Sequence, residues 1–204
     1  MKCILGGRED SPGSPDDKEN FARLLEEMRP RFDQHSLLLT AAVSAGLETI
    51  DKAYDVTTMV QMLDYINVMT YDFHGWWGDH AYTGHNSPLF PRTDELTQDS
   101  PGYKRNTHDA IQYWMSLGAP ASKLIVGIGT YGRGFILADP NQNGLYAAAT
   151  NGIDAAMYTA AKGYWGYNEY CEKRRTETWT VVRVGQHHFY HAGLSSISYV
   201  SLQL

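Results

Sequence analysis

Side chains able to do chemistry gather where two apolar segments end. One segment ends in Tyr71-Asp72-Phe73-His74-Gly75-Trp76-Trp77, and another ends in Thr130-Tyr131-Gly132-Arg133. A carboxylate next to a phenol suits hydrolytic chemistry, because Asp72 can orient a polar substrate group while Tyr71 donates a hydrogen bond to a developing oxyanion or an amide oxygen. Arg133 offers a fork of donors for sugar hydroxyls or for Asp72. The spacing also fits a structural Asp–Arg bridge, which is the more common role of such a pair.

Aromatic residues are abundant, with fourteen Tyr and five Trp. Flat rings stack on the apolar faces of sugars, so this supply suits carbohydrate recognition, although a single aromatic more often fills a core or an interface. For Trp76 and Trp77 both interpretations stay open: a stacking face for sugar, or a loop anchor. His74 is expected to be a hydrogen-bonded structural residue and not an acid–base catalyst.

The elements that position these residues alternate along the chain. Continuous apolar runs bounded by polar residues and glycine predict parallel strands buried on both faces, at 37–43, 65–70 and 124–128. Helices are expected between them: an amphipathic one after Asp16-Asp17 with Pro30 near its end, a short one over 56–62, and one from Thr107 to Gly118. This order indicates βαβ units, and hence a doubly wound sheet or a (β/α)8 barrel with function at the strand ends.

The character of the sequence changes after Leu137. A turn-rich segment over 139–144 leads into a mixed region, where a short helix is expected at 164–171 and a hairpin is expected to pair 179–184 with 188–191. The sequence therefore predicts an α/β domain over 1–137 and a small α+β insertion with an unmatched tail over 138–204.

Composition excludes several classes of protein. The apolar share of 43% excludes a disordered chain, and a net charge of −6 without a basic cluster argues against nucleic acid as a partner. No apolar stretch approaches the roughly 20 residues of a membrane span. No metal and no cofactor are expected. Cys3 and Cys171 allow at most one bridge, and two free thiols are the expected state.

Several blocks of the sequence, in order, resemble glycoside hydrolase family 18, the family of chitinases and chitinase-like lectins. The resemblance runs from about residue 6 to residue 184. Its blocks are Asp16-Asp17-Lys18-Glu19-Asn20-Phe21 through Val43, Asn67-Val68-Met69-Thr70-Tyr71-Asp72-Phe73-His74-Gly75, Thr83-Gly84-His85-Asn86-Ser87-Pro88-Leu89, Ala121-Ser122-Lys123-Leu124-Ile125 and Thr130-Tyr131-Gly132-Arg133.

The resemblance implies retaining hydrolysis of β-1,4-linked N-acetylglucosamine polymers, with the substrate's own N-acetyl oxygen as nucleophile. It implies two catalytic roles: Tyr71 hydrogen-bonds the N-acetyl carbonyl, and Asp72 tunes the acid and holds the sugar. The implied substrate-binding residues are Met69, Trp77, Tyr131 and Arg133. The implied partners are chitin or N-acetylglucosamine oligosaccharides. The implied location is extracellular, although the apolar start before Gly6 is too short for a secretory signal.

The resemblance also implies a fold, a partial TIM (β/α)8 barrel over 1–137. The three strands are similar to its fifth, sixth and seventh, and the residues after about 138 are similar to the α+β domain inserted after strand seven, apart from the unmatched tail. The resemblance further assigns Cys171 to a bridge with a later cysteine, which these residues lack, so a free thiol is expected.

One part of the family's site is missing from the 204 residues. The motif Asp-Gly-x-Asp-x-Asp-x-Glu, whose last Glu is the general acid, does not occur, and Glu9 lies in a loop that is not expected to replace it. Nothing after Val184 resembles the family's eighth strand with its tryptophan. We therefore expect the chain to be inactive alone, because loss of the acid removes roughly 10²–10⁴-fold of catalysis.

Two alternatives stay open. One is a non-catalytic lectin that binds chitin or oligosaccharides. The other is an unrelated barrel enzyme acting on phosphorylated sugars, which the absence of a Gly-rich phosphate loop after a strand disfavours.

Overall fold

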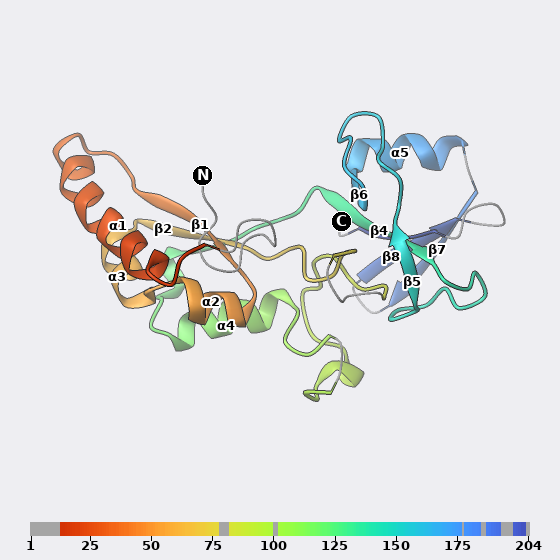
Figure 1. The fold of residues 1–204 in the computed structure, drawn as a ribbon, viewed down its shortest axis with the longest axis horizontal. Coiled ribbons are helices and arrows are strands. Elements are labelled where there is room, and N and C mark those ends of the chain that lie inside the picture. Colours follow the sequence, from red (N-terminus) through yellow and green to blue (C-terminus); the bar gives the residue numbers. More distant parts are fainter. Residues whose placement is uncertain are drawn as a thin grey trace. The chain divides into compact units, whose positions relative to one another are not determined.

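The computed structural model describes residues 13–77, 82–99, 102–176, 178–184, 187–192 and 198–202, with side chains described as far as Trp179 (Figure 1). It contains two compact units. The first unit consists of Met1–Thr70 and Thr107–Gly127, and the second consists of Tyr71–Asn106 and Ile128–Leu204. The domain division at residues 137 and 138 stays a prediction.

The first unit is built on a three-stranded parallel sheet. Its strands are β1 (Thr40–Ser44), β2 (Tyr65–Met69) and β3 (Leu124–Val126), in the order β1-β2-β3. This sheet confirms the predicted parallel arrangement. The first strand begins three residues later than the apolar run that predicted it.

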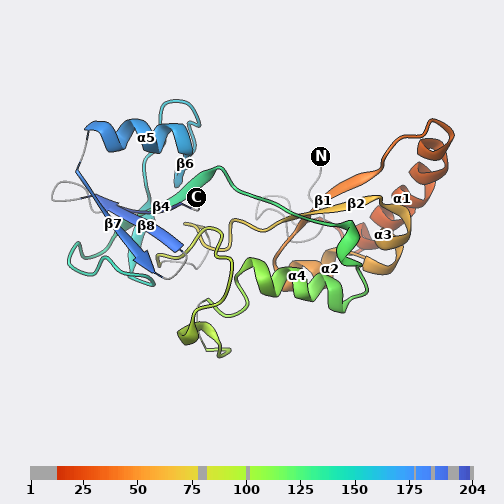
Figure 2. The same cartoon turned by 180° about the vertical axis from the view of Figure 1, so that it is seen from behind.

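Helices gather on one side of this sheet (Figures 1 and 2). They are α1 (Asp17–Gln34), α2 (Leu47–Ala53), α3 (Val56–Met62) and α4 (Thr107–Ser116), with a short 3₁₀ helix η2 (Ala121–Lys123) before β3. The helix α2 was not predicted. The helix α1 continues past Pro30, because Arg29 holds its last turn through a 2.8 Å ion pair with Asp64 and a 3.1 Å hydrogen bond to the Leu37 carbonyl. Gly118, with a φ of 100°, ends α4 as expected.

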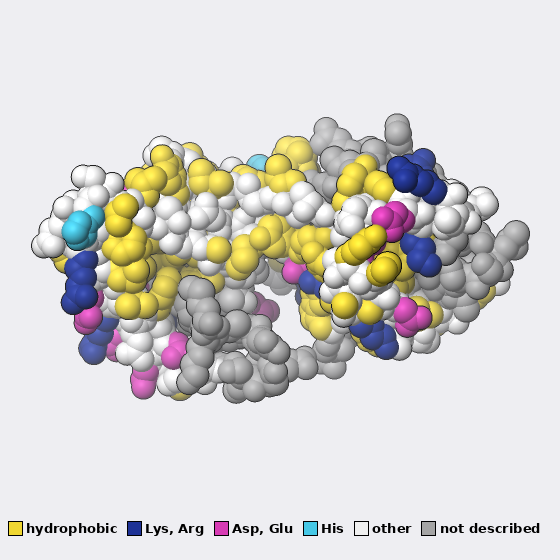
Figure 3. Space-filling view, turned by 90° about the horizontal axis from the view of Figure 1, so that it is seen from above, with side chains coloured by type: hydrophobic (Ala, Val, Ile, Leu, Met, Phe, Trp, Pro, Cys, Tyr) yellow, Lys and Arg dark blue, Asp and Glu magenta, His cyan; other side chains and the backbone are white. Residues whose placement is uncertain are grey.

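The strands are not buried on both faces, so the expectation of strands buried on both faces is wrong. Val43, Ile66 and Val68 are 0% exposed. Exposed apolar side chains lie in or beside the strands: Leu37 54%, Leu38 65%, Ile125 44%, Val126 47% and Ile128 78%. Hydrophobic side chains are correspondingly visible on the surface in Figure 3. The apolar runs indicate strands correctly, but a run alone does not show which faces have a covering layer.

The second unit is built on an antiparallel sheet. Its strands are β4 (Tyr131–Leu137), β5 (Ala149–Gly152), β6 (Tyr164–Gly166), β7 (Trp179–Val184), β8 (His187–Ala192) and β9 (Ser198–Leu202). The order is β5-β4-β9-β8-β7, and β6 also pairs with β4. The hairpin of β7 and β8 confirms the prediction. The unpredicted β9, in the unmatched tail, lies between β4 and β8.

Short helical segments complete the second unit: η1 (Thr93–Glu95) and α5 (Tyr167–Thr176). The helix expected at 164–171 begins at Tyr167, because Tyr164–Gly166 is the strand β6. Two apolar clusters form around Phe135, Leu137 and Ala149, and around Ile153, Trp165 and Tyr170. Cys171, on α5, is a free thiol as expected, while Cys3 lies outside the described residues.

Candidate functional site

Asp72 and the start of β4 form a hydrogen-bonded network in the second unit. The Asp72 Oδ1 atom accepts a hydrogen bond from the Tyr131 hydroxyl at 2.5 Å and another from Arg133 Nε at 2.8 Å. Tyr131 and Arg133 reach the same atom because alternate residues of a strand point to the same face. Among the described residues no group bonds Asp72 Oδ2, and the Asp72 side chain is 39% exposed. The predicted pairing of Asp72 with Arg133 is confirmed.

The electrostatics of this network favour a protonated phenol and a charged guanidinium. Burial, followed by the hydrogen bond to Asp72, raises the pKa of Tyr131 far above its usual value. For Arg133 burial alone lowers the pKa, but the hydrogen bond and charge of Asp72 outweigh it and the pKa is raised. The network therefore keeps its donors across the physiological range.

Tyr71 adds a phenol beside this network. Its ring meets the Tyr131 ring edge-on, with centroids 5.8 Å apart. Burial and the charge of Asp72 raise the pKa of Tyr71, so its hydroxyl keeps its proton. Within the described part of the chain no group forms a hydrogen bond with that hydroxyl, so it can donate to a ligand.

Three aromatic rings surround the Arg133 guanidinium. Its Cζ atom lies 5.0 Å from the Trp77 ring centroid, 5.5 Å from that of Tyr131 and 5.3 Å from that of Tyr164. The rings of Tyr131 and Tyr164 are themselves 4.5 Å apart. Tyr164 was missed from the sequence, because only the register of β6 with β4 places it opposite Arg133. Rings and a cation at these distances form a rigid surface of mixed polarity.

Comparison with known proteins identifies the family of this site. The family model for glycosyl hydrolases family 18 matches residues 8–199. The chain belongs to this family. Its fold is accordingly that of a TIM-barrel family with α/β content. The described strands other than β1, β2 and β3 belong to the antiparallel sheet.

Relatives of the chain within family 18 include both chitinases and a protein named as a pseudo-chitinase. Chitotriosidase-1 of Mus musculus is 40% identical over 183 residues, which are 84% of this chain and 38% of the mouse protein. The Group IV chitinase of Ostrinia furnacalis is 39% identical with a TM-score of 0.86, covering 98% of this chain and 53% of that one. Human YKL-39, a pseudo-chitinase with retained chitooligosaccharide binding properties, is 31% identical with a TM-score of 0.81, covering 93% and 53%. The chain spans about half the length of these structures.

The neighbouring tryptophans Trp76 and Trp77 have different environments. Trp76 is half-buried and packs on the cluster of Phe135, Leu137 and Ala149, which supports the loop-anchor interpretation. Trp77 is 38% exposed. A Cβ atom at Gly75 would lie 1.7 Å from the Trp77 ring, so glycine is required for Trp77 to fold back over this position. Trp77 is therefore the ring available for stacking.

The remaining residues for which the sequence predicted a role are His74, Met69 and Glu9. His74 is 3% exposed and its Nδ1 atom lies 3.0 Å from the His85 carbonyl oxygen, so its structural role is confirmed. Met69 is the last residue of β2 in the first unit, in register with Ser44. Its role as floor of a sugar site stays a prediction. Glu9 lies outside the described residues.

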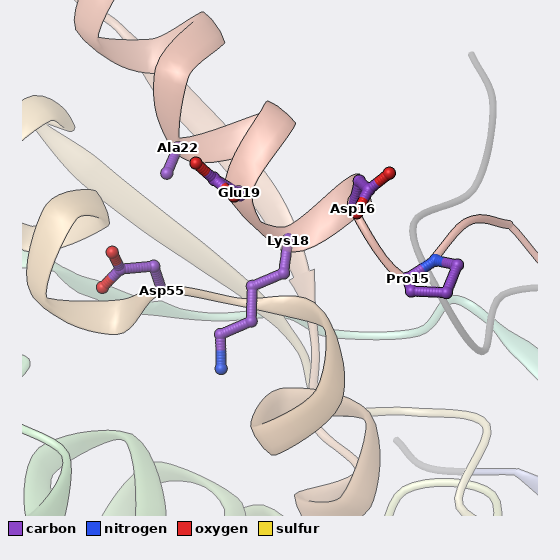
Figure 4. Close-up of a pocket in the computed structure, with 6 residues that line it drawn as sticks. All are labelled: Pro15, Asp16, Lys18, Glu19, Ala22 and Asp55. Atoms are coloured by element: carbon purple, nitrogen blue, oxygen red, sulfur yellow. The ribbon is translucent and has the colours of Figure 1, made fainter.

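A depression of ≈ 350 Å³ in the first unit offers no comparable chemistry (Figure 4). It is lined by Pro15, Asp16, Lys18, Glu19, Ala22 and Asp55. Lys18 donates to the Asp51 carbonyl at 2.8 Å, and Asp55 accepts from the backbone and hydroxyl of Thr58 at the start of α3. Lys18 and Asp55 thus form hydrogen bonds with groups at the ends of helices.

The described residues show neither of two other functional features. They contain no group of three or more His, Cys, Asp or Glu residues able to hold a metal ion. No described helix has the length and apolar character needed to cross a membrane.

Proposed function

We propose that this chain carries the substrate-positioning half of a family 18 chitinase site. In this proposal Tyr71, Asp72, Trp77, Tyr131 and Arg133 bind an N-acetylglucosamine unit of chitin or of its oligosaccharides. The observation that carries the proposal is the Asp72 carboxylate, which is held through one oxygen by Tyr131 and Arg133 and has its second oxygen unoccupied by described protein groups. Such an oxygen is an acceptor of fixed position beside a free phenol donor.

An acetamido group fits these two positions. Asp72 Oδ2 accepts the acetamido N–H, while the Tyr71 hydroxyl donates to the acetamido carbonyl oxygen. Held at both ends, the group presents its oxygen to the anomeric carbon, as substrate-assisted cleavage with retention requires. The carboxylate also stabilises the positive charge that develops on the acetamido group as the oxygen attacks.

Proton donation to the leaving oxygen is not assigned to this chain. These 204 residues contain no Asp-Gly-x-Asp-x-Asp-x-Glu motif. We therefore propose that the chain by itself binds and positions the sugar without cleaving it. An extracellular location is proposed from the family alone.

Calorimetric titration of the 204-residue chain tests the binding proposal. We expect tetra-N-acetylchitotetraose to bind and cellotetraose, which has the same linkage without acetamido groups, to bind at least about tenfold more weakly. The Asp72→Asn variant tolerates the left-handed backbone, removes the charge and replaces one acceptor oxygen by an amide donor, and it should weaken binding about tenfold. Equal affinity for the two ligands, or full affinity in the variant, would contradict the proposal.

A chromogenic N-acetylglucosamine oligomer tests the catalytic part separately. We expect no release of chromophore by the purified chain above the rate in buffer. Measurable release that is lost in Asp72→Asn would overturn the assignment of the chain to positioning alone.

A second candidate is a chitooligosaccharide lectin in which binding is the whole function. The three rings around Arg133 favour it, because they supply stacking surface without a proton donor. Titration of tryptophan fluorescence tests the binding on which this candidate depends, since a lectin should show saturable quenching that Trp77→Phe reduces. No quenching at millimolar oligosaccharide would exclude the lectin.

A further inference from the structure

We propose that Asn86 is a positioning residue of the sugar site, whose side-chain amide fixes the main chain of Asp72 against β4 and thereby sets the Asp72–Tyr131–Arg133 network. The inference deepens the proposed function, and it rests on that function for its affinity measurement.

The Asp72 backbone needs an external restraint. Its φ is 62°, in the left-handed region, which is unfavourable for a residue with a side chain and persists when the surroundings over-determine it. Asn86 provides the restraint at two successive amides. The Asn86 Oδ1 atom accepts a hydrogen bond from the Asp72 N–H at 3.1 Å. The main-chain carbonyl oxygen of Asn86 accepts another from the Phe73 N–H at 3.0 Å.

The other end of the same amide reaches β4. Asn86 Nδ2 donates to the Tyr131 carbonyl oxygen at 3.2 Å. One planar group thus joins the main chains of Asp72 and Tyr131, whose side chains are joined a second time by the 2.5 Å hydrogen bond. These two hydrogen bonds require an acceptor and a donor on one short side chain, so neither Asp nor Leu can replace Asn86.

Asn86 is itself held in place. It is 0% exposed, within a loop in which Thr83, His85 and Ser87 are also buried. Thr83 anchors the loop to a different segment: its hydroxyl donates to the Gly144 carbonyl at 2.8 Å and accepts from the Ala147 N–H at 3.0 Å. A buried polar loop tied at both ends is a rigid support for the residues it contacts.

Thr83 provides a matched control. It lies three residues from Asn86 in the same loop, is equally buried, and makes two side-chain hydrogen bonds that do not involve Asp72 or Tyr131. Thr83→Val and Asn86→Ala should therefore lower the thermal unfolding midpoint by similar amounts. Only Asn86→Ala should change the site.

The first measurement needs no ligand. In a proton NMR spectrum the Tyr131 hydroxyl proton, assigned by its loss in Tyr131→Phe, should be far downfield and slow to exchange. Asn86→Ala and Asn86→Asp should each shift or broaden this signal, while Thr83→Val retains it. Asn86→Asp keeps the acceptor for the Asp72 N–H and loses the donor to β4. It therefore replaces Asn86→Ala in this measurement if Asn86→Ala does not fold.

The second measurement is a double-mutant cycle on affinity for tetra-N-acetylchitotetraose. Asn86→Ala should weaken binding at least about tenfold in the natural background, and by less than about twofold in the Asp72→Gly background, because glycine accepts the left-handed φ and removes the carboxylate through which Asn86 acts.

Two results would overturn the inference: an unchanged Tyr131 signal in both folded Asn86 variants, or an affinity loss that persists without Asp72. If the unmodified chain binds no oligosaccharide, the proposed function fails, and the Tyr131 signal still decides the role of Asn86.

Discussion

In the first unit most of the fully buried side chains are apolar, such as Val43, Ile66 and Trp114, whereas the second unit also buries carboxylates and amides. Among the described residues, the first unit has the buried polar residues Thr70 and Thr107. The second unit has His74, Thr83, His85, Asn86, Ser87, Glu95, Asn106 and Glu169. Apolar burial is non-directional and supplies stability, while buried hydrogen bonds specify positions. The unit that carries the candidate site is the one built with directional contacts.

The largest expected effect tests the apolar unit. Trp114 is 0% exposed, packs on Tyr54 with ring centroids 5.6 Å apart and donates to the Ser44 carbonyl at 3.1 Å. Trp114→Ala should lower the free energy of unfolding by about 3–5 kcal/mol. Urea denaturation measures it, with Trp77→Ala as the control that should cost less than about 1 kcal/mol. A small cost for Trp114→Ala would mean that this unit is not held by its apolar core.

The next effect tests buried charge in the second unit. Glu169 is 3% exposed and accepts from the Tyr158 N–H, the Thr159 N–H and hydroxyl, and the Gly166 N–H. Burial alone raises its pKa, but these hydrogen bonds outweigh burial and lower the pKa from 4.5 to about 2. Because the folded pKa is the lower one, the stabilisation is complete above pH 4.5 and is lost as the pH falls toward 2.

Glu169→Gln should therefore cost roughly 2–3 kcal/mol at pH 7 and much less at pH 2.5. Urea denaturation at the two pH values measures the difference. Glu172→Gln, on an exposed position of the same helix α5, is the control. Equal costs of Glu169→Gln at both pH values would show that the charge of the Glu169 carboxylate does not stabilise its contacts with Tyr158, Thr159 and Gly166.

A smaller effect tests the network of the site. Tyr131→Phe removes one hydrogen bond to the Asp72 carboxylate and should lower the free energy of unfolding by about 1.5 kcal/mol at neutral pH. Tyr158→Phe removes a hydroxyl from a side chain that is 60% exposed, and should change it by less than about 0.5 kcal/mol. Equal costs for the two variants would show that the hydrogen bond from Tyr131 to Asp72 contributes no more to stability than an exposed hydroxyl does.

The smallest effect belongs to the surface of the first unit. Arg23 and Glu19 form an ion pair four residues apart on α1, with side chains 65% and 67% exposed. Arg23→Ala should change the free energy of unfolding by less than about 0.5 kcal/mol. A cost above 1 kcal/mol would show that charge pairs contribute to the first unit as well.

The elements that the sequence predicted correctly are those with a local pattern. The strand β2, the helix α3 and the hairpin of β7 and β8 were predicted from apolar runs, helical spacing and a glycine-containing turn. The family was predicted from the order of its blocks. The strand β9 was missed because its pairing with β4 and β8 is a contact between distant segments, which no local pattern encodes.

The candidate site divides in the same way. The sequence by itself determined which residue types follow the apolar runs: Tyr71, Asp72, Trp77, Tyr131 and Arg133. The tertiary structure decided how they meet: one carboxylate oxygen shared by two donors, Tyr164 brought beside Arg133 by strand register, and Trp76 separated from Trp77 by burial. It also decided that Asn86 joins the two segments. The physical reason is that side-chain chemistry is local, while a hydrogen bond between residues 45 positions apart exists only after the chain has folded.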